Sequence, residues 1–123
     1  NTSGIIFYRF GAPLYFANAT LSEEEVEKLV TEAASPVKWL VLDAEAMVDI
    51  DTTGLETLHQ VLTMLTKRGV TVAVSRANKS TSALLAQYHL LKLIGENRLF
   101  PTNRHAIAAF RKETGQETQE TTA

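Results

Sequence analysis

The chain of 123 residues contains no cysteine, and nowhere does it carry a run of eighteen or more apolar residues. The missing cysteine excludes disulfides, a thiolate nucleophile and zinc sites of the cysteine type, and it suits a cytosolic setting. The missing apolar run predicts that no part of the sequence spans a membrane, and the N-terminus lacks the layout of a signal peptide. Because the first residues are Asn1-Thr2-Ser3-Gly4, without an initiator methionine, we expect a piece of a longer protein.

A strong charge of one sign is also missing. Lysine and arginine total 12, aspartate and glutamate total 14, and the isoelectric point is near 5.9. Domains that bind nucleic acid normally present a basic face or stripe, whereas the basic residues here are scattered along the sequence. The composition therefore argues against nucleic acid as a partner.

Hydrophobic residues make up 45% of the sequence, which is enough for one packed core in one domain. Apolar runs of strand length alternate with segments of helical periodicity, and this order predicts an α/β domain. We expect a sheet of about five strands, opened by an N-terminal hairpin, and about four helices. The domain is expected over residues 1–113, and the polar sequence of residues 114–123 predicts a disordered tail.

The elements follow from the apolar patterns and from cap and turn residues. Strands are predicted at residues 5–10, 14–16, 37–42, 70–74 and 99–100, of which 37–42 reads as a central strand buried on both faces. The four helices are predicted to run from the capping box Ser22/Glu25 to Ser35, from about Thr53 to Arg68, from Lys79 through Leu91, and onward from a cap at Thr102.

The most informative motif joins the central strand to the second helix. It reads Val48-Asp49-Ile50-Asp51-Thr52-Thr53-Gly54-Leu55, with acids, two hydroxyls and a glycine in one turn. Hydroxyls at a helix start can cap backbone N–H groups, and a phosphate placed there would meet the positive end of the helix dipole. The two threonines are therefore either simple caps or part of a regulatory loop.

Two motifs resemble those of the STAS domain, the sulfate transporter and anti-sigma factor antagonist family. The segment Trp39–Asp43 leading to Asp49–Leu55 resembles the family as a whole, and the resemblance covers roughly residues 4 to 112. The opening Phe7-Tyr8-Arg9-Phe10, followed by residues 12–19, is similar to the C-terminal cytoplasmic STAS domain of SulP-type anion transporters. In free antagonists a kinase phosphorylates a serine that Thr52 matches here, whereas Asp51, Thr53 and Gly54 match residues that shape the loop.

The resemblance implies a domain that regulates, folds or assembles an anion transporter of the sulfate or bicarbonate class. Its partner would be the transmembrane part of the same transporter, and it would lie at the cytoplasmic face of the membrane. A homodimer is expected through the parent protein, with Phe7-Tyr8 and Tyr15-Phe16 near a sheet edge as apolar contact area. The alternative function is a free-standing anti-sigma factor antagonist regulated at the Asp51-Thr52-Thr53-Gly54 loop.

Other sites have weaker sequence support. The acids Asp43, Glu45, Asp49 and Asp51 could bind a divalent cation, but their spacing lacks the calcium-loop pattern, so a solvated loop is the interpretation adopted. The histidines His59, His89 and His105 have no zinc-binding spacing. A regulatory protein, or a nucleotide at the start of the second helix, is a further candidate partner, although no glycine-rich phosphate motif is present. We expect no catalytic residues, no metal and no cofactor, since no catalytic motif such as GxSxG occurs.

Overall fold

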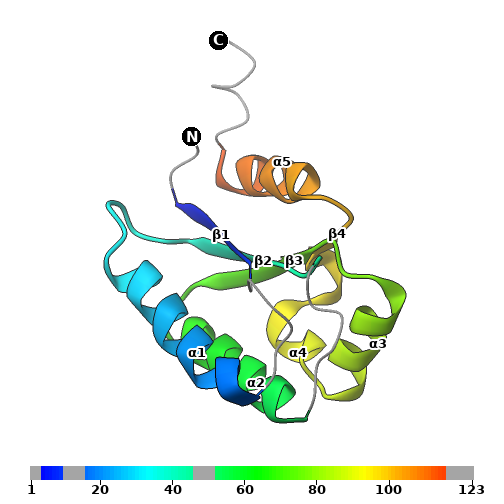
Figure 1. Cartoon of the computed structure of the whole chain (residues 1–123). Coiled ribbons are helices and arrows are strands. Elements are labelled where there is room, and N and C mark those ends of the chain that lie inside the picture. The colour runs from blue at the N-terminus through cyan, green and yellow to red at the C-terminus, as the bar shows by residue number, and fades with distance from the viewer. Residues whose placement is uncertain (1–3, 10–15, 46–51, 116–123) are drawn as a thin grey trace.

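The computed structural model describes residues 4–9, 16–45 and 52–115 (Figure 1). Within this part of the chain four parallel strands form one sheet in the order β1-β2-β3-β4. The strands are β1 (Ile5–Arg9), β2 (Trp39–Asp43), β3 (Thr71–Ser75) and β4 (Leu99–Phe100). The predicted α/β class is confirmed, and β2 has a neighbouring strand on each side, as its apolar run predicts.

Helices connect the strands and cover both faces of the sheet. They are α1 (Phe16–Thr31), α2 (Thr52–Lys67), α3 (Lys79–Gln87), α4 (Leu91–Ile94) and α5 (Asn103–Thr114), with a 3₁₀ turn at Glu96–Arg98. Figure 1 shows α5 alone on one face, whereas α1, α2, α3 and α4 lie on the other. Crossover helices on both faces are the usual arrangement for parallel strands.

The strands build a separate core on each face. On the face of α1 to α4, Leu40, Leu42, Val72 and Val74 pack with aliphatic side chains of the helices. On the α5 face, Trp39, Val41 and Ala73 pack against Ala106 and Phe110 of α5. The Trp39 and Phe110 rings meet edge to face with centroids 5.5 Å apart. Successive residues of β2 therefore serve opposite cores, which explains why the whole strand is buried.

The first helix starts earlier than predicted. Helix α1 begins at Phe16, so Ser22 lies inside the helix and the predicted capping box at Ser22 and Glu25 is wrong. No proline or glycine interrupts residues 16–31, so nothing in this stretch breaks a helix. The predicted strand at 14–16 is also corrected, because Phe16 is helical; residues 14 and 15 lie outside the described residues.

The third predicted helix is divided in two. After α3, His89 adopts φ 64°, a left-handed conformation that a right-handed helix cannot continue. The Leu90 N–H donates to the Leu85 carbonyl and the His89 N–H donates to the Ala86 carbonyl, which together form a Schellman ending. The break leaves Leu90 fully buried and starts α4 at Leu91.

Helix α1 ends at Thr31, before the predicted end at Ser35, whereas two other helix ends follow the sequence closely. Gly69 has φ 78° after α2, as its predicted left-handed cap requires. The Thr102 hydroxyl accepts a hydrogen bond from the His105 N–H, so Thr102 caps α5 as predicted. Helix α5 extends to Thr114, and residues 116–123 of the predicted tail lie outside the described part of the chain.

Candidate functional site

A polar row crosses the sheet at the carboxyl ends of its strands. Strand register pairs Arg9 of β1 with Asp43 of β2, and Asp43 with Ser75 of β3. Side chains two positions apart on a strand lie on the same face of the sheet. Arg9, Asp43 and Ser75 follow Phe7, Val41 and Ala73 by two positions, so all three belong to the α5 face. Ligand sites of parallel α/β sheets form at this carboxyl edge, so the row is the first place to look for function.

Asp43 is the centre of this row and is nearly completely buried. Its Oδ1 accepts hydrogen bonds from Arg76 Nε at 3.2 Å and from the Glu45 N–H at 3.1 Å. Its Oδ2 accepts from Arg76 Nη2 at 2.5 Å and from Asn103 Nδ2 at 3.2 Å. A carboxylate offers about four acceptor positions. The side chain of Asp43 is therefore saturated by protein donors.

These contacts set the ionisation of both partners. Burial raises the pKa of Asp43, but hydrogen bonds from Arg76, the Glu45 backbone and Asn103, with the positive charge of Arg76, outweigh burial and bring the pKa below the ordinary 3.8. The hydrogen bond to Asp43 is the main reason that the pKa of Arg76 is raised. Asp43 is thus an anion at neutral pH, held by a two-pronged guanidinium contact.

Arg76 has an unusual backbone for a bulky residue. Its φ is 59°, in the left-handed region that non-glycine residues rarely adopt. The Arg76 N–H donates to the Phe100 carbonyl at 3.0 Å, while its side chain holds Asp43 and places Nη2 3.0 Å from Glu45 Oε1. Such a conformation persists where the surroundings hold it from several sides, as they do here.

The ion pairs continue outward to the first strand. Glu45 Oε1 also lies 3.3 Å from Arg9 Nη2, and both of these side chains are about half exposed. Exposed pairs contribute little to stability, about 0 to 1 kcal/mol each. The buried Asp43–Arg76 contact is therefore the energetic centre, and Arg9 and Glu45 form its solvent-facing side.

The first residue of α5, Asn103, contacts the polar row from the α5 face of the sheet. The fully buried Ser75 hydroxyl donates a hydrogen bond to Asn103 Oδ1, and the amide of Asn103 donates to Asp43. Asn103 is the first residue of α5, so this chain of bonds fastens the helix to the ends of β2 and β3. A hydroxyl bonded to an amide oxygen has no base to activate it, so Ser75 is placed as a structural group.

Neither the cation alternative nor the solvated loop adopted for the acids Asp43 and Glu45 describes Asp43, which is buried and bonded to protein donors. Asp43 is saturated and Glu45 faces two arginines, so neither carboxylate is free for a metal ion. Asp49 and Asp51 lie outside the described residues. Within the part of the chain that is described, no three of His, Cys, Asp and Glu gather as a metal site. The three histidines are exposed and lie apart, His59 on α2, His89 between α3 and α4, and His105 on α5.

The loop predicted to be regulatory ends at the start of α2. Thr52 is the first residue of the helix and is exposed, whereas Gly54 is buried. Thr53 is the second helical residue, and its side chain lies outside the described residues, so a capping role of the threonines stays a prediction. Thr52 also lines a groove of about 180 Å³ together with the side chains of Leu55, Glu56, His59 and Tyr88.

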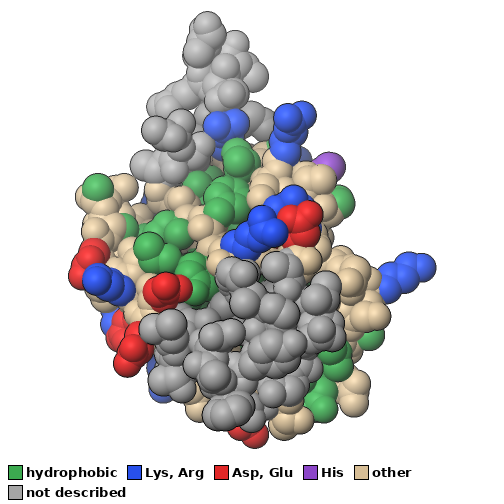
Figure 2. All heavy atoms as spheres, in the orientation of Figure 1, with side chains coloured by type: hydrophobic (Ala, Val, Ile, Leu, Met, Phe, Trp, Pro, Cys, Tyr) green, Lys and Arg blue, Asp and Glu red, His purple; other side chains and the backbone are tan. Residues whose placement is uncertain are grey.

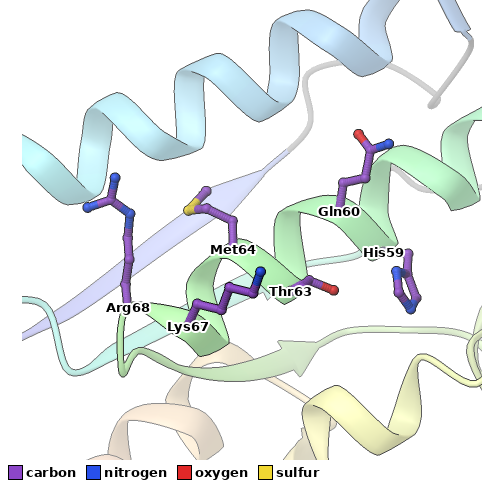
Figure 3. A pocket seen from close by; sticks show the side chains of 6 residues that line it. All are labelled: His59, Gln60, Thr63, Met64, Lys67 and Arg68. Atoms are coloured by element: carbon purple, nitrogen blue, oxygen red, sulfur yellow. The ribbon is translucent and has the colours of Figure 1, made fainter.

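A larger groove of about 600 Å³ follows the rest of α2. Figure 3 shows its lining side chains, all from α2 and the residue after it: His59, Gln60, Thr63, Met64, Lys67 and Arg68. Arg68 donates to Glu27 of α1 at 2.9 Å, which ties the groove to the neighbouring helix. None of the residues singled out in the phosphoacceptor loop lines this groove.

The sequence singled out Asp43 and Glu45 but predicted solvent around them, which is wrong for the buried Asp43. It missed Arg9, Ser75, Arg76 and Asn103. A usable signal was present, because Asp43 and Ser75 each end a predicted parallel strand and such ends meet at one edge of the sheet. Nothing in the sequence indicates the left-handed backbone that aims Arg76 at Asp43.

Comparison with known proteins gives consistent matches. The family model described as the STAS domain matches residues 1–106. A protein named as a probable sulfate transporter of Mycobacterium tuberculosis is 38% identical over 109 residues, which are 89% of this chain and 20% of that protein. The chain thus spans about a fifth of the length of this relative.

Two solved structures share the fold. The SulP transporter STAS domain from Vibrio cholerae has a TM-score of 0.79 at 26% identity, covering 94% of this chain and 88% of that one. A putative anti-sigma factor antagonist from Thermotoga maritima has a TM-score of 0.73 at 16% identity, covering 89% and 90%, and shows likeness of fold alone. In the described residues no helix is long and apolar enough to cross a membrane. The chain belongs to the STAS domain family, and it matches the STAS domains of SulP sulfate transporters.

Proposed function

We propose that this domain is the non-catalytic regulatory and assembly domain of a SulP-type secondary anion transporter. The observation that carries the proposal is the 38% identity to a probable sulfate transporter, spread over 89% of this chain but only 20% of that protein. A domain that makes up a fifth of a transporter leaves the rest of the length for a membrane part. We infer that this transmembrane part is the domain's partner and that sulfate or bicarbonate is the transported class.

The polar row supports a structural role at the carboxyl edge. All four acceptor positions of Asp43 are used by the protein, and the Ser75 hydroxyl is buried against an amide. The network joins β1, β2, β3 and α5, so it stiffens the edge from which the loop to α2 departs. A stiff edge beside an exposed Thr52 suits a surface that a partner recognises.

The loop at Thr52 is the proposed regulatory element, with Asp49, Asp51, Thr53 and Gly54 shaping it. Thr52 is exposed, lines a small groove and starts a helix of 16 residues, where negative charge is stabilised by the dipole. A regulatory protein or a nucleotide phosphate would meet the loop there. The same proposal places the end of the domain at residue 113 and a disordered polar tail over residues 114–123.

Location at the cytoplasmic face and homodimerisation through the parent protein complete the proposal. Phe7 on strand β1 is 36% exposed and supports an apolar contact. Tyr8 is buried and donates to Glu25 Oε1, so it offers no such surface. Tyr15 and the side chain of Phe16 lie outside the described residues. The alternative function, a free antagonist, is supported by the loop at Asp51–Gly54 and by a fold match at 16% identity.

The test is uptake of radiolabelled sulfate and of bicarbonate by the full-length parent protein, compared with a variant from which residues 1–113 are deleted. We expect the intact protein to transport one of the two anions and the deletion to alter the rate or the amount of assembled transporter in the membrane. Cross-linking of the intact protein should give a dimer. A parent protein without a membrane part, or one whose uptake and assembly ignore the deletion, contradicts the proposal.

A further inference from the structure

Two arginines meet at one carboxylate oxygen on the solvent side of the polar row. Arg9 Nη2 lies 3.3 Å and Arg76 Nη2 lies 3.0 Å from Glu45 Oε1. In the orientation of Figure 1, Figure 2 shows basic and acidic side chains side by side on the surface beneath α5. Guanidinium groups are common protein ligands of oxyanions, and here the protein's own glutamate occupies the position between them. We call Arg9 and Arg76 the arginine pair.

The protein holds Arg76 in place without using all of its donors. Its Nε and Nη2 donate to Asp43, and its backbone N–H donates to the Phe100 carbonyl. A guanidinium carries five N–H groups, so most of them remain for a second anion. Because the side chain is already ordered, an anion that binds here does not have to immobilise it.

Glu45 is held much less firmly than Arg76. Its side chain is 50% exposed, and its carboxylate pairs with the arginine pair alone among the described ion pairs. Exposed ion pairs contribute little to stability, so the Glu45 carboxylate turns into water at small cost. The site that it leaves lies at the carboxyl ends of parallel strands, where α/β sheets commonly bind ligands.

Charge and shape select the anion that fits this site. Without Glu45, the two positive charges of the arginine pair and the one negative charge of Asp43 leave a single positive charge. A monovalent anion neutralises that charge, whereas divalent sulfate would leave an excess negative charge close to the buried Asp43. The position already accepts a planar carboxylate. Bicarbonate is a small monovalent anion with the same planar O–C–O group.

We propose that the arginine pair binds bicarbonate in place of the Glu45 carboxylate, which acts as a built-in competitor. The binding itself follows from the contacts of these three side chains. Its use rests on the proposed function, because a domain attached to a transporter of the sulfate or bicarbonate class would then respond to an anion of that class.

The test is a nuclear magnetic resonance titration of the full 123-residue chain with bicarbonate, in sealed samples at mildly alkaline pH and constant ionic strength. We expect saturable shifts of the Arg9 and Arg76 side-chain signals, competition by acetate, and weaker binding of sulfate. Glu45→Gln removes the competitor and should tighten bicarbonate binding about tenfold. Adding Arg9→Gln to Glu45→Gln should reverse that gain, because one of the two guanidinium groups is lost.

The matched control is Glu113→Gln, which removes an acid that is 53% exposed and lies 3.8 Å from Arg98 on the α5 side. It should leave bicarbonate affinity unchanged, and circular dichroism shows whether each variant is folded. Equal tightening in Glu45→Gln and Glu113→Gln, no tightening in either, or stronger binding of sulfate than of bicarbonate to Glu45→Gln would overturn the proposal. Binding of acetate without bicarbonate would also overturn it. Absence of anion uptake by the parent protein would contradict the proposed function and leave the titration result standing.

Discussion

The two faces of the sheet are built differently although the same strands supply both. The face of α1 to α4 is packed with aliphatic residues from four helices and two central strands. The α5 face is covered by one helix and relies on three aromatic residues, Trp39, Phe100 and Phe110, whose rings pack together. Toward the carboxyl ends of the strands, this second face changes from apolar to polar at Arg9, Asp43 and Ser75.

The α1 to α4 face supplies most of the buried core and hence stability, whereas the polar edge of the α5 face is a surface that a partner could recognise. The aliphatic side chains that the four helices bury on their side, such as Leu62 and Val72, have packing as their role, so we expect substitutions at these buried positions to act on folding. At the edge of the α5 face lie the saturated carboxylate of Asp43, the left-handed backbone of Arg76 and the first residue of α5. Functional surfaces on an α/β domain are expected where covering elements end.

The largest effect is expected for Phe110→Ala. The ring is fully buried against Trp39 and beside Gly4, and removing a buried phenylalanine costs about 3 to 5 kcal/mol of unfolding free energy. Trp39 is the single tryptophan, so its fluorescence reports this face, while far-ultraviolet circular dichroism reports the whole fold. Urea denaturation followed by both signals measures the loss.

The matched variant is Leu62→Ala in α2, which is buried in the other core and should cost about 2 to 5 kcal/mol. If the domain unfolds as one unit, both signals change together in both variants. A Phe110→Ala protein whose Trp39 signal changes at lower urea than its circular dichroism would show that the α5 face opens independently. A loss below about 1 kcal/mol would contradict the packing described for α5.

Arg76 tests the polar edge of the α5 face. Arg76→Ala removes two hydrogen bonds from the buried carboxylate of Asp43 and keeps a side chain at φ 59°, so about 1 to 3 kcal/mol should be lost. Arg76→Gly removes the same bonds but accepts the left-handed backbone. The glycine variant should therefore be the more stable of the two by about 1 kcal/mol, measured by urea denaturation. Equal stability would mean that the backbone of Arg76 is not held left-handed.

The pH dependence of stability should report Asp43. Its folded-state pKa lies below the ordinary 3.8, so the unfolded chain binds more protons between the two values and stability rises with pH in that window. The contribution of Asp43 is fully present above the unfolded pKa and is lost as the pH falls through the folded pKa. Wild type should thus exceed Asp43→Asn in unfolding free energy at neutral pH, and the difference should shrink below about pH 4. A difference that grows on acidification would reverse the assigned sign.

Sequence patterns predicted most of the face that four helices cover. The apolar run of β2, the stripe of α2 and the cap at Gly69 are local signals, and each led to the right element. The α1 start was misplaced because Ser22 and Glu25 satisfy the local capping pattern while the preceding residues are equally able to be helical. The break at His89 was missed because glycine, not histidine, is the usual residue in that conformation.

The candidate site was less predictable because it depends on contacts between distant residues. Asp43 and Asn103 are 60 positions apart, and Asp43 and Arg76 are 33 apart. An acid next to other acids in sequence indicates a cation or solvent, whereas in the described part of the fold Asp43 and Glu45 form ion pairs with arginines. The register of the parallel strands brings these residues together, and the sequence pattern does not specify that register.

The smallest effect on stability is expected for Thr52→Glu, which lies at the border between the stable face and the recognised edge. The new charge would be stabilised at the start of α2 by about 0.3 to 1 kcal/mol and repelled to a similar extent by the acids of the preceding loop. The melting temperature should change by no more than a few degrees.

Thr52 is exposed and lines the groove with Glu56 and Tyr88, so a partner docking there would meet the added charge directly. Thr52→Gln has a similar length without charge and is the control. We expect Thr52→Glu, and not Thr52→Gln, to alter anion uptake by the full-length parent protein. If Thr52→Glu unfolds the domain, the loop has a structural role and the regulatory proposal is wrong. If both variants transport like wild type and keep every partner, Thr52 has no role beyond starting the helix.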